Sequence, residues 1–125
     1  MPEFTEDDLR KVLEKEPELT KYGWGYPSWP PSPQEDIHFR GPEILRQINV
    51  AADFLAGLER SETIEPLGLT SFSLMHFLAC RTRSQISNGS VIAAAIHLGF
   101  EVERIDRTPQ ARFNVSRETW ERITS

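Results

Sequence analysis

His76 and Cys80 carry the side chains best suited to chemistry, because they stand four residues apart in a segment with helical spacing. On one face of a helix they could hold a metal ion as a pair, or act as base and nucleophile. A zinc site needs further ligands, and a catalytic pair needs a third residue that orients the base. A helical histidine near a buried cysteine is more often packing, so we expect no metal site here.

Paired carboxylates occur in charged runs that are typical of an exposed surface: Asp7 and Asp8, Glu35 and Asp36, and Glu101 and Glu103. Catalytic acids instead need a cleft that shifts their pKa values. The sequence has no glycine-rich phosphate loop, no nucleophile elbow and no zinc-ligand spacing. It therefore predicts a chain that is not an enzyme and uses no cofactor.

Arginine and not lysine supplies the positive charge of the second half of the chain, which could contact a polyanion. Residues 1–70 hold seven Lys/Arg and 14 Asp/Glu, whereas residues 71–125 hold seven Arg and five Asp/Glu. Arginine suits phosphate contacts and minor-groove insertion, and the start of a helix favours phosphate. The candidate nucleic-acid-binding residues are Arg81, Arg83, Asn88, Ser90, Arg107 and Arg112.

The helix expected over 88–98 also argues against DNA binding. It has no Lys, Arg or Gln, so few of its side chains could hydrogen-bond to base edges. Ala93, Ala94 and Ala95 favour close packing against another helix. A structural or protein-binding use of this region is therefore an equal alternative.

Aromatic residues alternate with small residues and prolines between Tyr22 and Pro33. The four prolines of this stretch exclude a helix and favour an extended course. One interpretation is a strap whose rings pack on the helical body. The other is an exposed segment that presents anchors to a protein partner. Those anchors would be Trp24, Tyr26 and Trp29.

Capping residues and apolar spacing predict the elements that position these side chains. Thr5, followed by acids, caps a first helix that ends at Pro17. Pro42 opens the longest helix, which we expect to end near Arg60.

The sequence of the second half predicts a helix, a second helix and then a β-hairpin. Gly99 ends the helix over 88–98 in a left-handed conformation, and alternating apolar residues flank a turn at 106–109. A short amphipathic helix follows the hairpin. The residues that cap these three helices are Thr70 or Ser71, Ser87 and Ser116.

This order is that of a winged helix, whose second helix can enter the DNA major groove. We therefore predict an α+β, mostly helical fold, winged-helix-like over 70–116 and preceded by two helices and the aromatic strap. One domain spans 1–125, with the acidic helix and extended segment in 1–41 and the helical core in 42–125. The residues that we expect to be largely buried are Ile48, Leu55, Leu74, Leu78, Ile92, Ile96, Phe100 and Phe113.

The apolar stretch from Val91 to Leu98 is far short of the roughly 20 residues that cross a membrane. Cys80 is the only cysteine, so no intramolecular disulfide can form, and the acidic N-terminus lacks the apolar segment of a secretory signal. These features predict a cytoplasmic protein without membrane contact. They leave its oligomeric state open.

The second half contains Leu74-Met75-His76 and, further on, the run from Gln85 to Ala95, Gln-Ile-Ser-Asn-Gly-Ser-Val-Ile-Ala-Ala-Ala. These two segments resemble small uncharacterised proteins of bacterial plasmids and prophages. Those proteins have a Leu-Lys-His segment before a Tyr-Ile-x-Asn-Gly-x-x-Ile-Ala-Ala-Ala segment. The corresponding residues here are 74–76 and 85–95, with Met75 in place of the lysine and Gln85 in place of the tyrosine. The resemblance implies a shared fold and a mobile-element setting, but no particular activity.

Two functions follow as hypotheses. The first is a winged-helix-like regulator that binds nucleic acid through the arginines and the start of the helix over 88–98. The second is an inhibitor or adaptor, of the kind that blocks a defence system, that docks on a protein through the acidic front half and the Trp/Tyr segment.

Overall fold

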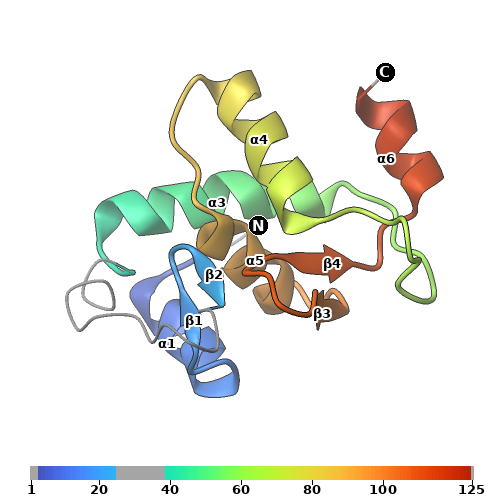
Figure 1. Ribbon diagram of the computed structural model, residues 1–125. Coiled ribbons are helices and arrows are strands. Elements are labelled where there is room, and N and C mark those ends of the chain that lie inside the picture. Colours follow the sequence, from blue (N-terminus) through green and yellow to red (C-terminus); the bar gives the residue numbers. More distant parts are fainter. Residues whose placement is uncertain (1–2, 25–38, 125) are drawn as a thin grey trace.

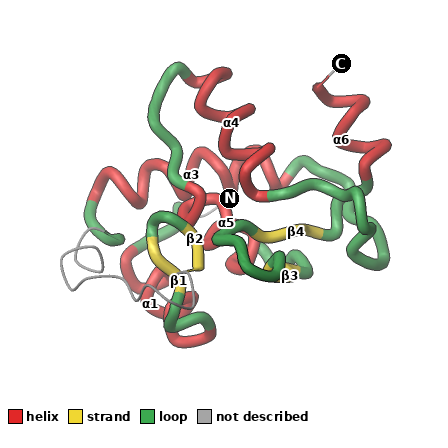
Figure 2. The backbone as a smooth tube through the Cα atoms, in the orientation of Figure 1, coloured by secondary structure: helices red, strands yellow, loops and turns green. Residues whose placement is uncertain are grey.

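The computed structural model describes residues 3–24 and 39–124 (Figure 1). The described elements are α1 (Glu6–Lys15), β1 (Leu19–Thr20), β2 (Gly23–Trp24), α3 (Pro42–Ala56), α4 (Ser71–Thr82), α5 (Asn88–His97), β3 (Val102–Arg104), β4 (Ala111–Phe113) and α6 (Arg117–Thr124). Helices dominate, and the described strands pair only as β1 with β2 and β3 with β4 (Figure 2). The predicted α+β, mostly helical class is confirmed.

α1 forms where its capping residue predicts. The Thr5 hydroxyl accepts a hydrogen bond from the Asp8 N–H at 3.3 Å, and the Asp8 carboxylate accepts one from the Thr5 N–H at 2.9 Å. This reciprocal pair satisfies backbone donors that the first helical turn leaves free. The bond from the Thr5 backbone also lowers the pKa of Asp8. Leu9 and Val12 lie buried on the inner face of the helix.

α3 begins at Pro42 as predicted, but it ends at Ala56 and not near Arg60. The Gly57 N–H donates to the Phe54 carbonyl oxygen at 3.2 Å. This bond joins residues three apart, as in a 3₁₀-helix, so the last turn is tighter than an α-helical turn. The buried residues of the helix repeat at helical spacing. They are Ile44, Gln47, Ile48, Ala51, Ala52 and Leu55.

The predicted caps of the second half are confirmed. The hydroxyls of Thr70, Ser87 and Ser116 each accept a bond from the backbone N–H three residues later, at 3.0–3.2 Å. α4 ends at Thr82 and is capped by Arg83, which has a left-handed φ of 53°, and α5 is followed by Gly99 with φ of 84°. Local capping residues therefore mark the boundaries of these helices.

β4 lies between two neighbours, because the segment before α4 pairs with its free edge. β3 pairs with β4 in antiparallel register, with Val102 opposite Phe113. On the other side, Thr70 bridges Arg112, and the Phe113 N–H donates to the Leu69 carbonyl oxygen at 2.9 Å. The start of α4 is thereby fixed beside the hairpin.

α5 is the interior helix of the molecule. Every residue from Asn88 to Ala95 is buried. α3 packs along it, while α1, α4, β2 and β3 contact it from other directions (Figure 1). The three consecutive alanines present little side-chain bulk, so the neighbouring helix can approach closely, as the sequence predicts.

The core contains seven of the eight residues expected to be buried, with exposed fractions of 0–6%. Ile96 is the exception, because it is only half-buried at the last turn of α5. A residue on the apolar stripe of a helix can thus be only partly covered at the end of that helix.

Candidate functional site

Asn88 and Ser90 do not face solvent, which corrects their assignment to a nucleic-acid-binding surface. Asn88 is 4% exposed, and its amide donates to the carbonyl oxygens of Tyr22 and Pro109, each at 2.9 Å. Ser90 is fully buried and donates to Gln47 Oε1 at 3.1 Å. Both side chains hold the fold together.

The hairpin β1–β2 closes the N-terminal end of α5. The Gly89 N–H donates to the Lys21 carbonyl oxygen at 2.9 Å. A side chain at Gly89 would overlap the Thr20 carbonyl oxygen and reach within 2.8 Å of Lys21 Cα. The backbone of the turn therefore occupies the place where a phosphate would approach this helix end.

The candidate arginines lie in separate places. Arg81 and Arg83 are at the C-terminal end of α4, whereas Arg112 is beside Thr70 at its N-terminal end. The helix has 12 residues, so roughly 16 Å separates these two ends. Arg107 is exposed in the turn between β3 and β4. Arg81 and Arg83 therefore do not lie at the same end of α4 as Arg112, so these three arginines are not gathered into one basic cluster.

Trp24 is a core residue and not an exposed anchor. It is 4% exposed, and its indole Nε1 donates to Glu16 Oε2 at 3.3 Å. Its backbone N–H donates to the Pro109 carbonyl oxygen at 3.3 Å. For Trp24 the interpretation as a packed strap is confirmed. Tyr26 and Trp29 lie outside the described residues.

His76 and Cys80 are both exposed on α4, so the expectation of a buried cysteine is wrong. Across residues 3–24 and 39–124, no three His, Cys, Asp or Glu side chains gather closely enough to share a metal ion. No helix in these ranges has the length and apolar character that crossing a membrane requires.

An open groove of about 510 Å³ runs between α3, the end of α4, and α6. Its α3 wall consists of Val50, Asp53, Phe54, Gly57 and Leu58. Its α4 wall consists of Leu78, Arg81 and Thr82, and Ile123 of α6 completes it. We refer to these nine residues as the α3–α4–α6 groove.

Three aromatic rings join α6 to the rest of the fold beside this groove. The Phe77 and Trp120 ring centroids are 5.2 Å apart, and those of Phe54 and Phe77 are 5.3 Å apart. The Phe77 and Trp120 rings meet edge to face, which is a favourable arrangement, and the Phe54 and Phe77 rings are tilted by 51°. Ile123, one turn beyond Trp120, keeps 36% of its surface exposed at the groove. The apolar face of α6 is therefore only partly covered.

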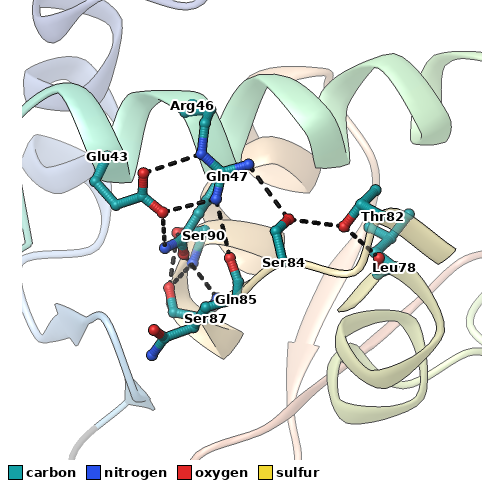
Figure 3. Close-up of polar contacts among 9 residues, drawn as sticks. All are labelled: Glu43, Arg46, Gln47, Leu78, Thr82, Ser84, Gln85, Ser87 and Ser90. Atoms are coloured by element: carbon teal, nitrogen blue, oxygen red, sulfur yellow. Dashed lines mark hydrogen bonds and ion pairs between the residues drawn. The ribbon is translucent and has the colours of Figure 1, made fainter. Parts of the chain in front are cut away.

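A polar network fixes the α4 wall of the groove to α3 (Figure 3). Arg46 binds Glu43 through two bonds of 2.6 and 2.9 Å, and also donates to Ser84 Oγ at 3.4 Å and to the Gln85 carbonyl oxygen at 3.2 Å. Ser84 Oγ in turn lies 2.8 Å from Thr82 Oγ1 in the groove. The turn that follows α4 is thus held to the first half of α3.

This network makes stability depend on the charge of Glu43. Hydrogen bonds from Arg46, and then from Gln47, lower the pKa of Glu43 from its ordinary 4.5 to about 2. The stabilisation is present above pH 4.5 and is lost as the pH falls towards 2, because the unfolded chain takes up its proton first.

We expect Glu43→Gln to lower the free energy of unfolding at neutral pH and to have progressively less effect as the pH falls from 4.5 towards 2. Urea unfolding of both chains across this interval measures the difference. A difference that stays constant with pH would contradict the assignment.

Comparison with known proteins adds no relative, since no family model, no curated protein and no solved structure matches the chain. The plasmid and prophage setting therefore stays a prediction.

Proposed function

We propose that this chain is a small non-catalytic binding protein that docks a segment of another protein in the α3–α4–α6 groove. This is the protein-binding hypothesis with a different docking surface. Trp24 is buried and cannot act as an anchor, so the proposed docking surface is formed by α3, the end of α4 and α6.

The order of elements supports a winged-helix-like scaffold. α3, the 69–70 segment, α4, α5 and the β3–β4 hairpin follow one another, and the segment before α4 pairs with β4. In a DNA-binding protein of this type the second helix of the helix-turn-helix pair would lie in the major groove. Here that helix is α5, and α1 and β2 pack against it. The proposed scaffold therefore binds through another face.

The observation that carries the proposal is an open apolar groove with aromatic residues at its edge. Phe54 and Ile123 line it, and Trp120 is half-buried beside it. Protein interfaces are enriched in aromatic residues and arginine, and Arg81 is part of this groove. An apolar surface of this kind gains free energy when a partner covers it.

Gly57→Arg tests the proposal with little risk to the fold. A Cβ at Gly57 would meet only the Phe54 carbonyl oxygen at 3.7 Å, and its φ of −90° suits any residue. The new side chain would fill the groove. Ala56→Arg is the matched control, because Ala56 is exposed, adjacent and outside the groove.

We expect the wild type and Ala56→Arg to capture a common protein from nuclease-treated lysate, and Gly57→Arg to lose it. Mass spectrometry of the three eluates makes the comparison. Equal capture by all three chains would contradict the proposal, as would a ligand that disappears on nuclease treatment.

A further inference from the structure

We infer that the occupant of the α3–α4–α6 groove is an amphipathic helix with an acidic residue on the flank facing α4 and a basic residue on the flank facing α3. This inference rests on the proposed function. It adds the chemistry of the partner, which follows from two charged side chains that the fold leaves without an ion pair.

Arg81 is the first of these side chains. Its guanidinium carbon lies 5.8 Å from the ring centroids of both Phe54 and Phe77. Rings on which a guanidinium rests restrict its position while leaving its N–H groups available to a carboxylate. Within the described ranges, no acidic side chain forms an ion pair with Arg81. The two rings therefore hold the Arg81 guanidinium in place, and no described acidic side chain neutralises its charge.

Asp53 is the second, on the opposite wall of the groove. It precedes Phe54 in α3 and is exposed, and its carboxylate forms no ion pair or hydrogen bond with another described residue. Although both residues line the groove, Asp53 and Arg81 do not pair with each other. The two walls therefore present opposite charges, and the other lining residues are apolar except Gly57 and Thr82.

The shape of the α3 wall favours a helix as the occupant. Val50 and Phe54 are four residues apart on one face of α3, and Leu58, two residues beyond the end of the helix, lines the same groove. Gly57 lies beside these residues without a side chain, which leaves room for a bulky residue of the partner. A helix with apolar residues at matching spacing would place its own ridge alongside them.

The opposite charges also determine the direction of the bound helix. Its apolar face would lie on the apolar side chains of the groove, so one flank would face α4 and the other would face α3. If the same helix were reversed, its acidic flank would face Asp53 and its basic flank would face Arg81. Both contacts would then join like charges, which disfavours that direction.

Selection from a displayed library of random peptides, about four helical turns long, tests this inference on the full chain. We expect enriched peptides with apolar residues at helical spacing, acids on one flank and bases on the other. Arg81→Glu should weaken these peptides by about tenfold or more, and should itself select bases on the flank facing α4. Arg81→Lys, which keeps the charge, should weaken them less. Circular dichroism checks that each variant is folded.

Two other results would overturn the inference, and they differ in what they leave standing. If Gly57→Arg abolishes binding of the peptides but they show no charge preference, the proposed groove function survives and the partner chemistry is wrong. If no selected peptide depends on Gly57, both the partner chemistry and the groove function are wrong.

Discussion

Gly89→Ala should separate the β1–β2 hairpin from the N-terminal end of α5 and lower the free energy of unfolding by about 3 kcal/mol, at the upper end of the usual cost of overpacking. The new methyl group would overlap the Thr20 carbonyl oxygen and lie 2.8 Å from Lys21 Cα. Both are backbone atoms, so no side chain can rotate away. Alanine's better helix propensity offsets at most about 1 kcal/mol of this cost.

The measurement for Gly89→Ala is the urea midpoint and slope, together with amide spectra of residues 19–24. Gly57→Ala is the control, because its Cβ has ordinary contacts and its φ is negative. We expect that control to stabilise the chain by about 0.4–1 kcal/mol. Unchanged stability in Gly89→Ala would mean that the hairpin does not close α5 as described.

Phe113→Ala should have the largest effect on stability, about 3–5 kcal/mol. Phe113 is fully buried in β4, and its backbone joins both neighbours of that strand. Removing the ring leaves a cavity that a core fixed on both sides cannot fill.

Leu67→Ala is the comparison for Phe113→Ala, since Leu67 is also a large apolar residue but is 66% exposed. We expect its effect to stay within about 0.5 kcal/mol. Denaturant unfolding measures both variants. A cost for Phe113→Ala no larger than that for Leu67→Ala would contradict the core described here.

The starts of the capped helices and the β3–β4 hairpin could be predicted because their signals are local. Thr5, Thr70 and Ser87 each bond to a backbone group within three residues. Turn residues at 106–109 and the alternating flanks indicated the hairpin in the same way. The apolar stripes likewise indicated most of the core, since periodicity reports which face of a helix is buried.

The β1–β2 hairpin could not be predicted, because distant contacts hold it. Each of its strands has two residues, which is too short for an alternating pattern. The hairpin instead depends on Gly89, Asn88 and Pro109, which lie far along the chain. Asn88 and Ser90 were misplaced for this reason: a helix start favours phosphate only while nothing else covers it.

The groove was missed although several of its residues were visible in the sequence. Phe54 widened the apolar stripe of α3, and Trp120 and Ile123 stood one turn apart in α6. Their spacing indicates an apolar face for each helix, but not how far apart the helices lie. That separation is set by the contacts of Trp120 with Phe54 and Phe77.

Site-specific photo-crosslinking in living cells tests most directly whether the α3–α4–α6 groove binds a protein. A benzophenone amino acid would replace Ile123 at the groove in one chain and Arg107 at the β3–β4 turn in another. We expect a discrete protein adduct from position 123, abolished by Gly57→Arg and kept by Ala56→Arg, with no adduct from position 107. Nucleic-acid adducts from position 107, with none from position 123, would contradict protein binding in the groove.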